Sequence, residues 1–392
     1  MNRLYGLTLL ACCAITAGCN NDTSFNPQDP ASVTVSGNLP ATSTTGATVS
    51  PAVVVRDASG RPLAGVVVTF QITQGGGTID RTTASTNGNG VASVSWTLGA
   101  DPVVNTLIAS VPALDPVIFD VTPCGVYCVE IRYVGTISAP LRAAFTNARI
   151  RWEQVIVGNL PSVQLNVGAG ACKDSDGEAL VDHPAINEVI DDLVVYVQID
   201  SIDGPGGVLG SAGPCFIRNA SRLPVLGVMR FDRADLLLME QNGLLNDVIL
   251  HELGHVLGFP TIWNDTQFNL LVGSGTDNPY FTGTNAVSRF QLAGGSPVNG
   301  VGVPVENTGG AGTRDAHWRE SVLASELMTG FISSGNNPLS TVTIGSLADI
   351  GYTVDYGAAD PYVVPSGGHT SGWSTLRLEM IELPMPAPRT VP

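Results

Sequence analysis

The stretch DVILHELGHVLGFP, residues 247–260, holds two histidines four positions apart, with a glutamate directly after the first. Apolar residues recur at helical spacing around them, so the sequence predicts a helix here. On that helix His251 and His255 lie one turn apart on one face, which lets both imidazoles bind one zinc ion. Glu252 lies beside them, where it can take a proton from a zinc-bound water. Histidines on an apolar helix face are also common as hydrogen-bonded core residues, but the complete pattern, with Gly258 after it, favours a metal centre.

A catalytic zinc ion needs a third protein ligand and an open position for water. In the commonest long form of this motif, that ligand is a histidine at the position that Thr261 holds here. Residues 257–304 contain no Glu, His or Cys, so Asp265 and Asp277 are the carboxylates that follow the helix most closely. The next histidine along the chain is His317, well beyond the short motif.

Three motifs that follow one another, HELGHVLGF, AHW and ELMTGF, resemble those of the leishmanolysin-type metalloproteases, a branch of the metzincins. With weaker similarity around them, the resemblance covers about residues 129–356. In that family the third histidine follows a long insertion, and a methionine lies in a tight turn beneath the metal. The resemblance therefore implies an endopeptidase in which a zinc-bound water, activated by a glutamate, hydrolyses peptide bonds. It assigns zinc ligation to His251, His255 and His317, the role of general base to Glu252, the turn after the helix to Gly258 and the Met-turn to Met328.

Segments on either side of the motif are expected to shape a cleft. The segment PVLGVMRFD, residues 224–232, predicts a strand, and the resemblance implies that such a strand pairs with an extended substrate. Residues 260–292 predict a loop-rich part of the cleft wall. His183 and His369 have no partner at ligand spacing, so we expect both to be structural or exposed.

Residues 31–123 predict an all-β domain, because alternating Val, Thr and small residues are interrupted by glycine-rich turns. The phrases VVVRDASGRPLAGVVVTFQITQGGGTI and TNGNGVASVSWTLG resemble the bacterial Ig-like domains of the invasin and intimin type. Such modules are spacers or adhesive surfaces in that family, and the fold does not choose between the two roles. The predicted fold class is thus multidomain, an all-β Ig-like sandwich followed by an α+β metzincin-like zinc protease domain over residues 124–358. Residues 359–392 predict a loosely ordered C-terminal extension.

Residues 1–19, MNRLYGLTLLACCAITAGC, have the layout of an export signal, with an arginine, an apolar run and then small residues. The triplet Ala17-Gly18-Cys19 resembles the lipobox of bacterial lipoproteins, which implies lipidation of Cys19 after cleavage. An ordinary cleaved secretory signal is the alternative. Polar residues 20–30 then predict a flexible tether. We therefore expect an exported protein, either secreted or held at the bacterial cell envelope by a lipid anchor.

Four cysteines follow the predicted signal: Cys124, Cys128, Cys172 and Cys215. An even number of cysteines in an oxidising compartment predicts two disulfides. Three pairings are open, of which the simplest joins Cys124 to Cys128 and Cys172 to Cys215. A zinc site made of these four cysteines would lack a CxxC pair, and a role for the first two in blocking the metal is less simple than a disulfide.

The formal net charge of −16 and the sequence pI of about 4.5 would repel phosphate backbones, so nucleic-acid binding is excluded. The expected partners are protein or peptide substrates. The competing function is that of a surface-anchored adhesin or binding protein whose protease-like domain is non-catalytic. The intact Glu252 favours the enzyme, because a purely structural zinc site does not need a base beside it.

Overall fold

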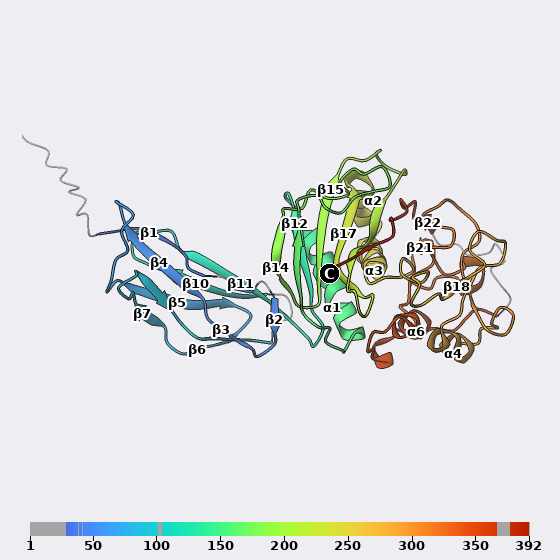
Figure 1. Ribbon diagram of the computed structural model, residues 1–392, viewed down its shortest axis with the longest axis horizontal. Coiled ribbons are helices and arrows are strands. Elements are labelled where there is room, and N and C mark those ends of the chain that lie inside the picture. Colours follow the sequence, from blue (N-terminus) through green and yellow to red (C-terminus); the bar gives the residue numbers. More distant parts are fainter. Residues whose placement is uncertain (1–28, 38, 41, 101–103, 367–376, 392) are drawn as a thin grey trace, which may run out of the picture.

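The structure is a computed structural model that describes residues 29–37, 39–40, 42–100, 104–366 and 377–391 (Figure 1). Its N-terminal part is a β-sandwich in which apolar side chains alternate along the strands and meet in one core, as in Val53, Val55, Val68 and Phe70. One group of hydrogen-bonded strands has the order β1 (Pro30–Val35), β4 (Ala52–Asp57) and β8 (Val91–Ser93). Another has the order β2 (Thr42–Thr44), β11 (Val117–Cys124), β10 (Asn105–Ser110), β5 (Val67–Gln74) and β7 (Thr83–Ser85). The remaining group has the order β3 (Thr48–Val49), β9 (Trp96–Leu98) and β6 (Gly77–Ile79).

A second, mixed sheet follows the sandwich along the chain and contains five strands. Its order is β12 (Val129–Val134), β15 (Leu193–Asp200), β17 (Pro224–Asp232), β16 (Gly210–Ile217) and β23 (Arg389–Thr390). The first three strands are parallel to one another, β16 is antiparallel to β17, and β23 is parallel to β16. The end of the chain, marked C in Figure 1, therefore lies against this sheet rather than away from it.

Both faces of this sheet are covered, because successive side chains of a strand point to opposite faces. Val195 and Val197 pack in one core with helices α1 (Ala139–Val155) and α3 (Leu245–Val256). Val194 and Tyr196 belong to a second core, which the hairpin of β13 (Val163–Val167) and β14 (Ile186–Ile190) completes. Helix α2 (Arg233–Gln241) follows β17 directly, and Asp232 caps it by accepting hydrogen bonds from the backbone N–H groups of Ala234 and Asp235.

The chain after α3 is rich in loops and is held by a cluster of buried aromatic side chains. Trp263 lies with its ring centroid 4.5 Å from that of Phe259, 4.3 Å from that of Phe281 and 5.0 Å from that of Trp318. The elements of this part are β18 (Leu271–Val272), β19 (Tyr280–Phe281), α4 (Thr284–Leu292), β20 (Val303–Pro304), α5 (Glu320–Leu323), β21 (Phe331–Ser333), α6 (Thr341–Asp349), a 3₁₀ turn (Tyr356–Ala358) and β22 (Arg377–Glu379).

Two expectations about strands and tail are wrong. The segment 224–232 is β17, which has neighbours on both sides and so has no free edge for a substrate. The strand nearer the edge is β16, and its outer side is taken by residues of the C-terminal extension. That extension is not loose over residues 377–391, because β22 pairs with β21 and β23 pairs with β16.

The four cysteines form the simplest pairing, Cys124 with Cys128 and Cys172 with Cys215. The first disulfide lies between the end of β11 and the start of β12, where the sandwich meets the second sheet. Within the described ranges, no helix combines the length and apolar character that crossing a bilayer requires. The predicted signal, Cys19, nearly all of the tether and His369 lie outside the described residues.

Candidate metal centre

Helix α3 carries the two histidines of the opening motif into the protein interior. Its apolar residues, among them Val248, Ile249 and Leu253, pack in the core beneath the sheet. Trp152 of α1 donates its indole N–H to the backbone carbonyl of Leu250, with a distance of 2.8 Å, and so fixes the helix against its neighbour. The predicted helix is therefore present, and packing of its apolar residues in the core sets its rotation about its own axis.

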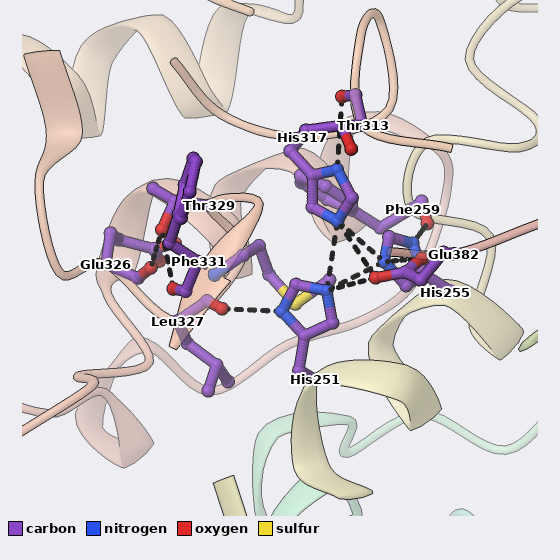
Figure 2. Close-up of polar contacts among 11 residues, drawn as sticks. His251, His255, Phe259, Thr313, His317, Glu326, Leu327, Thr329, Phe331 and Glu382 are labelled. Carbon is purple, nitrogen blue, oxygen red and sulfur yellow. Dashed lines mark hydrogen bonds and ion pairs between the residues drawn. The ribbon is translucent and has the colours of Figure 1, made fainter. Parts of the chain in front are cut away.

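Three imidazoles converge at one point, although one of them comes from a distant part of the chain (Figure 2). The Nε2 atoms of His251 and His255 lie 2.9 Å apart, and the Nε2 atom of His317 lies 3.1 Å from the first and 3.2 Å from the second. All three side chains are almost completely buried. Asp265 is not part of this cluster; its carboxylate pairs with Arg222 instead.

Each imidazole is held in place through its other ring nitrogen. The Nδ1 atoms of His251, His255 and His317 lie 2.6 Å, 2.6 Å and 3.2 Å from the backbone carbonyl oxygens of Leu327, Phe259 and Thr313, respectively (Figure 2). A carbonyl oxygen can only accept, so each Nδ1 must carry the proton and donate it. In the neutral form of each ring, Nε2 then has a free lone pair that points to the centre of the cluster, which is the tautomer a metal ligand needs.

Burial also favours the neutral form of these ligands. It lowers the pKa of His251, and it lowers the pKa of His255 to about 3, because an imidazolium would lose its hydration shell inside the protein. Neutral imidazole is the form that binds a metal ion, so protons do not compete for these two nitrogens near neutral pH.

Glu252 lies on the same helix with no exposed surface, and neither of its carboxylate oxygens has a hydrogen-bond partner among the described residues. Burial raises the pKa of this carboxyl well above its usual range, and the nearby carboxylate of Glu382 raises it further. A buried acid whose oxygens lack partners is costly to the fold, and in a native protein it calls for an explanation such as a bound cation, whose charge would favour the ionised form that a general base needs.

The turn after α3 depends on Gly258, which has φ = +108° and ends the helix. This conformation favours glycine, as predicted for a turning residue. The backbone N–H of Gly258 donates to the carbonyl of His255, and the next carbonyl, that of Phe259, is the acceptor for the ring of the same histidine. The turn therefore orients a ring of the cluster.

Met328 is completely buried and lies against α3, since a Cβ atom on Gly254 would be 2.8 Å from its sulfur. The turn that contains it is held by Glu326, a buried carboxylate that sequence reasoning missed. One oxygen of Glu326 accepts from the backbone N–H of Met328 at 2.7 Å, and the other accepts from the hydroxyls of Ser340 and Thr343 at 2.7 and 2.6 Å. The signal for Glu326 in the sequence is its place two residues before the methionine in ELMTGF.

A fourth group at the centre, Glu382, comes from the C-terminal extension and was also missed. Its Oε1 lies 3.5 Å from Nε2 of His251 and 3.4 Å from Nε2 of His317, and its Oε2 lies 3.3 Å from Nε2 of His255. Its side chain is only 7% exposed, and Oε1 has no hydrogen-bond partner among the described residues. No motif or spacing in the sequence marks this residue.

The four groups fit a tetrahedral ion. With bonds of 2.0–2.2 Å to nitrogen and oxygen, neighbouring ligand atoms of a zinc tetrahedron lie roughly 3.3 Å apart. The corresponding distances here run from 2.9 to 3.5 Å, with Oε1 of Glu382 facing His251 and His317 and Oε2 facing His255. Three nitrogens and one carboxylate are a donor set that suits zinc. His183 plays no part, because its Nε2 accepts from the backbone N–H of Ala171 in a separate loop.

Comparison with known proteins links the part of the chain that contains the three histidines to one peptidase family. A family model described as leishmanolysin, Peptidase_M8, matches residues 161–372, which is more than half of the chain. A leishmanolysin homolog of Crithidia fasciculata is 27% identical over 166 residues, and the match covers 41% of this chain and 24% of that protein. The chain thus matches about a quarter of the length of this curated relative.

Solved structures similar to this chain include adhesin domains. The D0-D1 domain of intimin is 21% identical, with coverage of 23% of this chain and 47% of that chain and a TM-score of 0.18. The adhesin InvE of Yersinia pseudotuberculosis is 22% identical, with coverage of 25% and 32% and a TM-score of 0.21.

Proposed function

The chain belongs to the leishmanolysin family of peptidases, and from this premise we propose that it is a zinc-dependent metalloendopeptidase. One observation carries the proposal. Three imidazole Nε2 atoms converge within 3.2 Å of one another, beside a buried glutamate that has no hydrogen-bond partner among the described residues. We propose that His251, His255 and His317 hold a single catalytic zinc ion. When bound, zinc supplies a Lewis acid that polarises a scissile carbonyl and makes a water molecule more acidic.

The chain's own residues supply the remaining chemistry in this proposal. Glu252 accepts the proton of the attacking water and later passes it to the leaving amine. Its burial, and the absence of competing hydrogen bonds from described residues, leave both oxygens available for this transfer. Gly258 and Met328 act through the ligands, the first by turning the chain toward His255 and the second by filling the space beside α3.

The substrate is expected to bind along β16. This strand borders the metal centre, because its residue Gly210 forms a bridge with Glu382. An extended peptide can add to a strand edge through backbone hydrogen bonds, while alternate side chains enter pockets. Residues 224–232 cannot take this part, because they form β17 inside the sheet.

We also propose the division of the chain that the sequence predicts. Residues 31–123 form an Ig-like spacer or adhesive module, residues 124–358 form the α+β, metzincin-like protease domain, and residues 359–392 are a C-terminal extension. We further propose that the protein is either held at the cell envelope by a lipid on Cys19 or secreted. This part of the proposal does not depend on the geometry of the site.

The test of the proposed function is the zinc content of the purified protein, measured by elemental analysis. We expect about one zinc per chain in the parent and a clear loss in His317→Ala when a competing chelator is present, because one of the three proposed imidazole ligands has been removed. Asp265→Asn is the control, since this carboxylate lies on the same excursion but pairs with Arg222. Absence of zinc from the parent, or full retention by His317→Ala, would overturn the proposal and return the adhesin alternative.

A further inference from the structure

The C-terminal strap, residues 377–391, crosses the metal centre between two strand edges. Near its start, β22 pairs antiparallel with β21, and the backbone N–H of Met380 donates to the carbonyl of Gly330 at 3.1 Å. Around Glu382, the N–H of Leu209 donates to the carbonyl of Ile381 at 2.8 Å, and the N–H of Leu383 donates to the carbonyl of Gly210 at 2.9 Å. The strap therefore occupies backbone positions along β16 that a bound peptide would need.

Side chains anchor the strap on both sides of the centre. Met380 is completely buried and Val391 nearly so. Met385 packs over β16 so closely that a Cβ atom on Gly213 would lie 2.7 Å from its Cγ. The guanidinium of Arg389 lies 4.3 Å from the ring centroid of Phe216. These contacts distribute the attachment over the whole strap, so Glu382 is not held in place by the histidines alone.

Glu382 brings a carboxylate into a buried site where the Nε2 atoms of three imidazoles lie 3.3–3.5 Å from its oxygens. Burying a carboxylate among neutral groups is unfavourable unless a cation neutralises it. A divalent ion at the centre of the cluster would do so, and the spacing of the four groups matches a tetrahedral ligand set. A structural zinc site has four protein ligands, whereas a catalytic one keeps an open position.

We propose that Glu382 is the fourth protein ligand of the zinc ion and that the C-terminal strap is an intramolecular inhibitor, which closes both the metal and the edge of β16 to peptides. This inference rests on the proposed function. In the closed form the coordination shell has no open position, and the backbone groups of β16 near Gly210 are satisfied by the strap. Displacement of the strap frees the metal position and the strand edge together.

One glycine offers a way to displace the strap without touching a ligand. A Cβ atom on Gly312 would lie 1.9 Å from the backbone oxygen of Glu382 and 2.6 Å from its carbonyl carbon. Backbone cannot move aside as a flexible side chain can, so Gly312→Ala must push the strap away at Glu382. Gly310 in the same loop is a matched control, because a Cβ atom there meets nothing within 4 Å.

The experiment measures binding of acetohydroxamate, a small chelating anion that needs open positions on the metal, to the zinc-loaded full chain by titration calorimetry. We expect Glu382→Gln and Gly312→Ala to bind acetohydroxamate at least about tenfold more tightly than the parent, because the parent must first release Glu382. Glu379→Gln and Gly310→Ala should bind like the parent. Glu379 is exposed on the same strap, so its substitution removes an equal charge without reaching the centre.

A second readout separates the ligand from the strap. Removal of a ligand weakens the site, so Glu382→Gln should lose zinc to a competing chelator faster than Glu379→Gln does. Equal acetohydroxamate affinity in the parent and both opening variants, with zinc bound throughout, would overturn this inference and leave the proposed function standing. If Glu382→Gln does not fold, Gly312→Ala decides. A parent without zinc would instead overturn the proposed function.

Discussion

Replacement of Gly258 with alanine should destabilise the protein by more than the same replacement at Gly351. Both glycines have φ = +108° and both end a helix, α3 in the first case and α6 in the second. They differ in their surroundings. A Cβ atom on Gly258 would lie 2.7 Å from Cδ1 and 2.8 Å from Cγ1 of the buried Ile262, whereas one on Gly351 would meet nothing within 4 Å.

The difference between the stability losses of the two variants measures the cost of the close contact with Ile262. Forcing a residue with a Cβ atom into this backbone region costs about 1–3 kcal/mol at either position. Overpacking against a side chain that has no free space costs a further ~1–3 kcal/mol, and only Gly258→Ala carries it. The free energy of unfolding should therefore fall by about 2–6 kcal/mol in Gly258→Ala and by about 1–3 kcal/mol in Gly351→Ala.

Urea unfolding of the parent and the two variants, with m-values compared, measures these losses. In a double-mutant cycle, Gly258→Ala should cost less in an Ile262→Ala background than in the parent, because Ile262→Ala removes both atoms that the new Cβ meets; this smaller cost is the recovery expected in the double variant. Zinc retention should also fall in Gly258→Ala, since the carbonyl of Phe259 holds the ring of His255 at 2.6 Å. Equal losses at Gly258 and Gly351, with no recovery in the double variant, would refute the reasoning.

Three further predictions concern the base, the methionine and a buried acid. In a Gly312→Ala background, Glu252→Gln should lower kcat for peptide hydrolysis by about 10²–10⁴ and leave zinc content unchanged; surviving hydrolysis would exclude Glu252 as the base. Met328→Ala should lower the free energy of unfolding by about 2–5 kcal/mol, and Met328→Leu should lower it by less than about 1.5 kcal/mol. Both variants should bind as much zinc as the parent. Loss of zinc in the leucine variant would count against a purely packing role. Burial raises the pKa of Asp192 from 3.8 to about 6, so the folded state binds more protons between these values. The contribution of Asp192 to the free energy of unfolding is therefore greatest below pH 4 and is lost as the pH rises through 6, a total change on the order of 2 kcal/mol. In Asp192→Asn, the free energy of unfolding, measured as a function of pH, should change less over this range.

The centre was predictable from sequence where local spacing determines geometry. A helix with histidines four residues apart must place both on one face, so His251 and His255 required no tertiary information. His317 was different, because its approach depends on a long excursion closed by Trp263 and its aromatic neighbours, and only the order of motifs pointed to it. The carbonyl acceptors behind the rings are backbone groups, which leave no trace in residue types.

The misplaced substrate strand has a physical explanation as well. The position of PVLGVMRFD shortly before the active-site helix favours a strand beside the cleft, but a nearly continuous apolar run is typical of a strand buried on both faces inside a sheet. The sequence GSAGPCFI of β16 contains Pro214, which cannot donate to a neighbouring strand and is therefore tolerated at edges. Glu382 could not have been predicted by either rule, since its position depends on pairing at two separate strand edges.

The disulfide between Cys124 and Cys128 has a mechanical consequence. Residues 125–128 are all that separates the last strand of the sandwich from the first strand of the second sheet, and the crosslink closes this connection into a small ring. A guanidinium nitrogen of Arg149, on α1, also donates to the carbonyl of Pro123. The connection is thus stiff and restricts rotation between the sandwich and the second sheet. The sandwich and the second sheet are therefore expected to reorient together, so that the direction in which the metal centre faces follows the orientation of the sandwich.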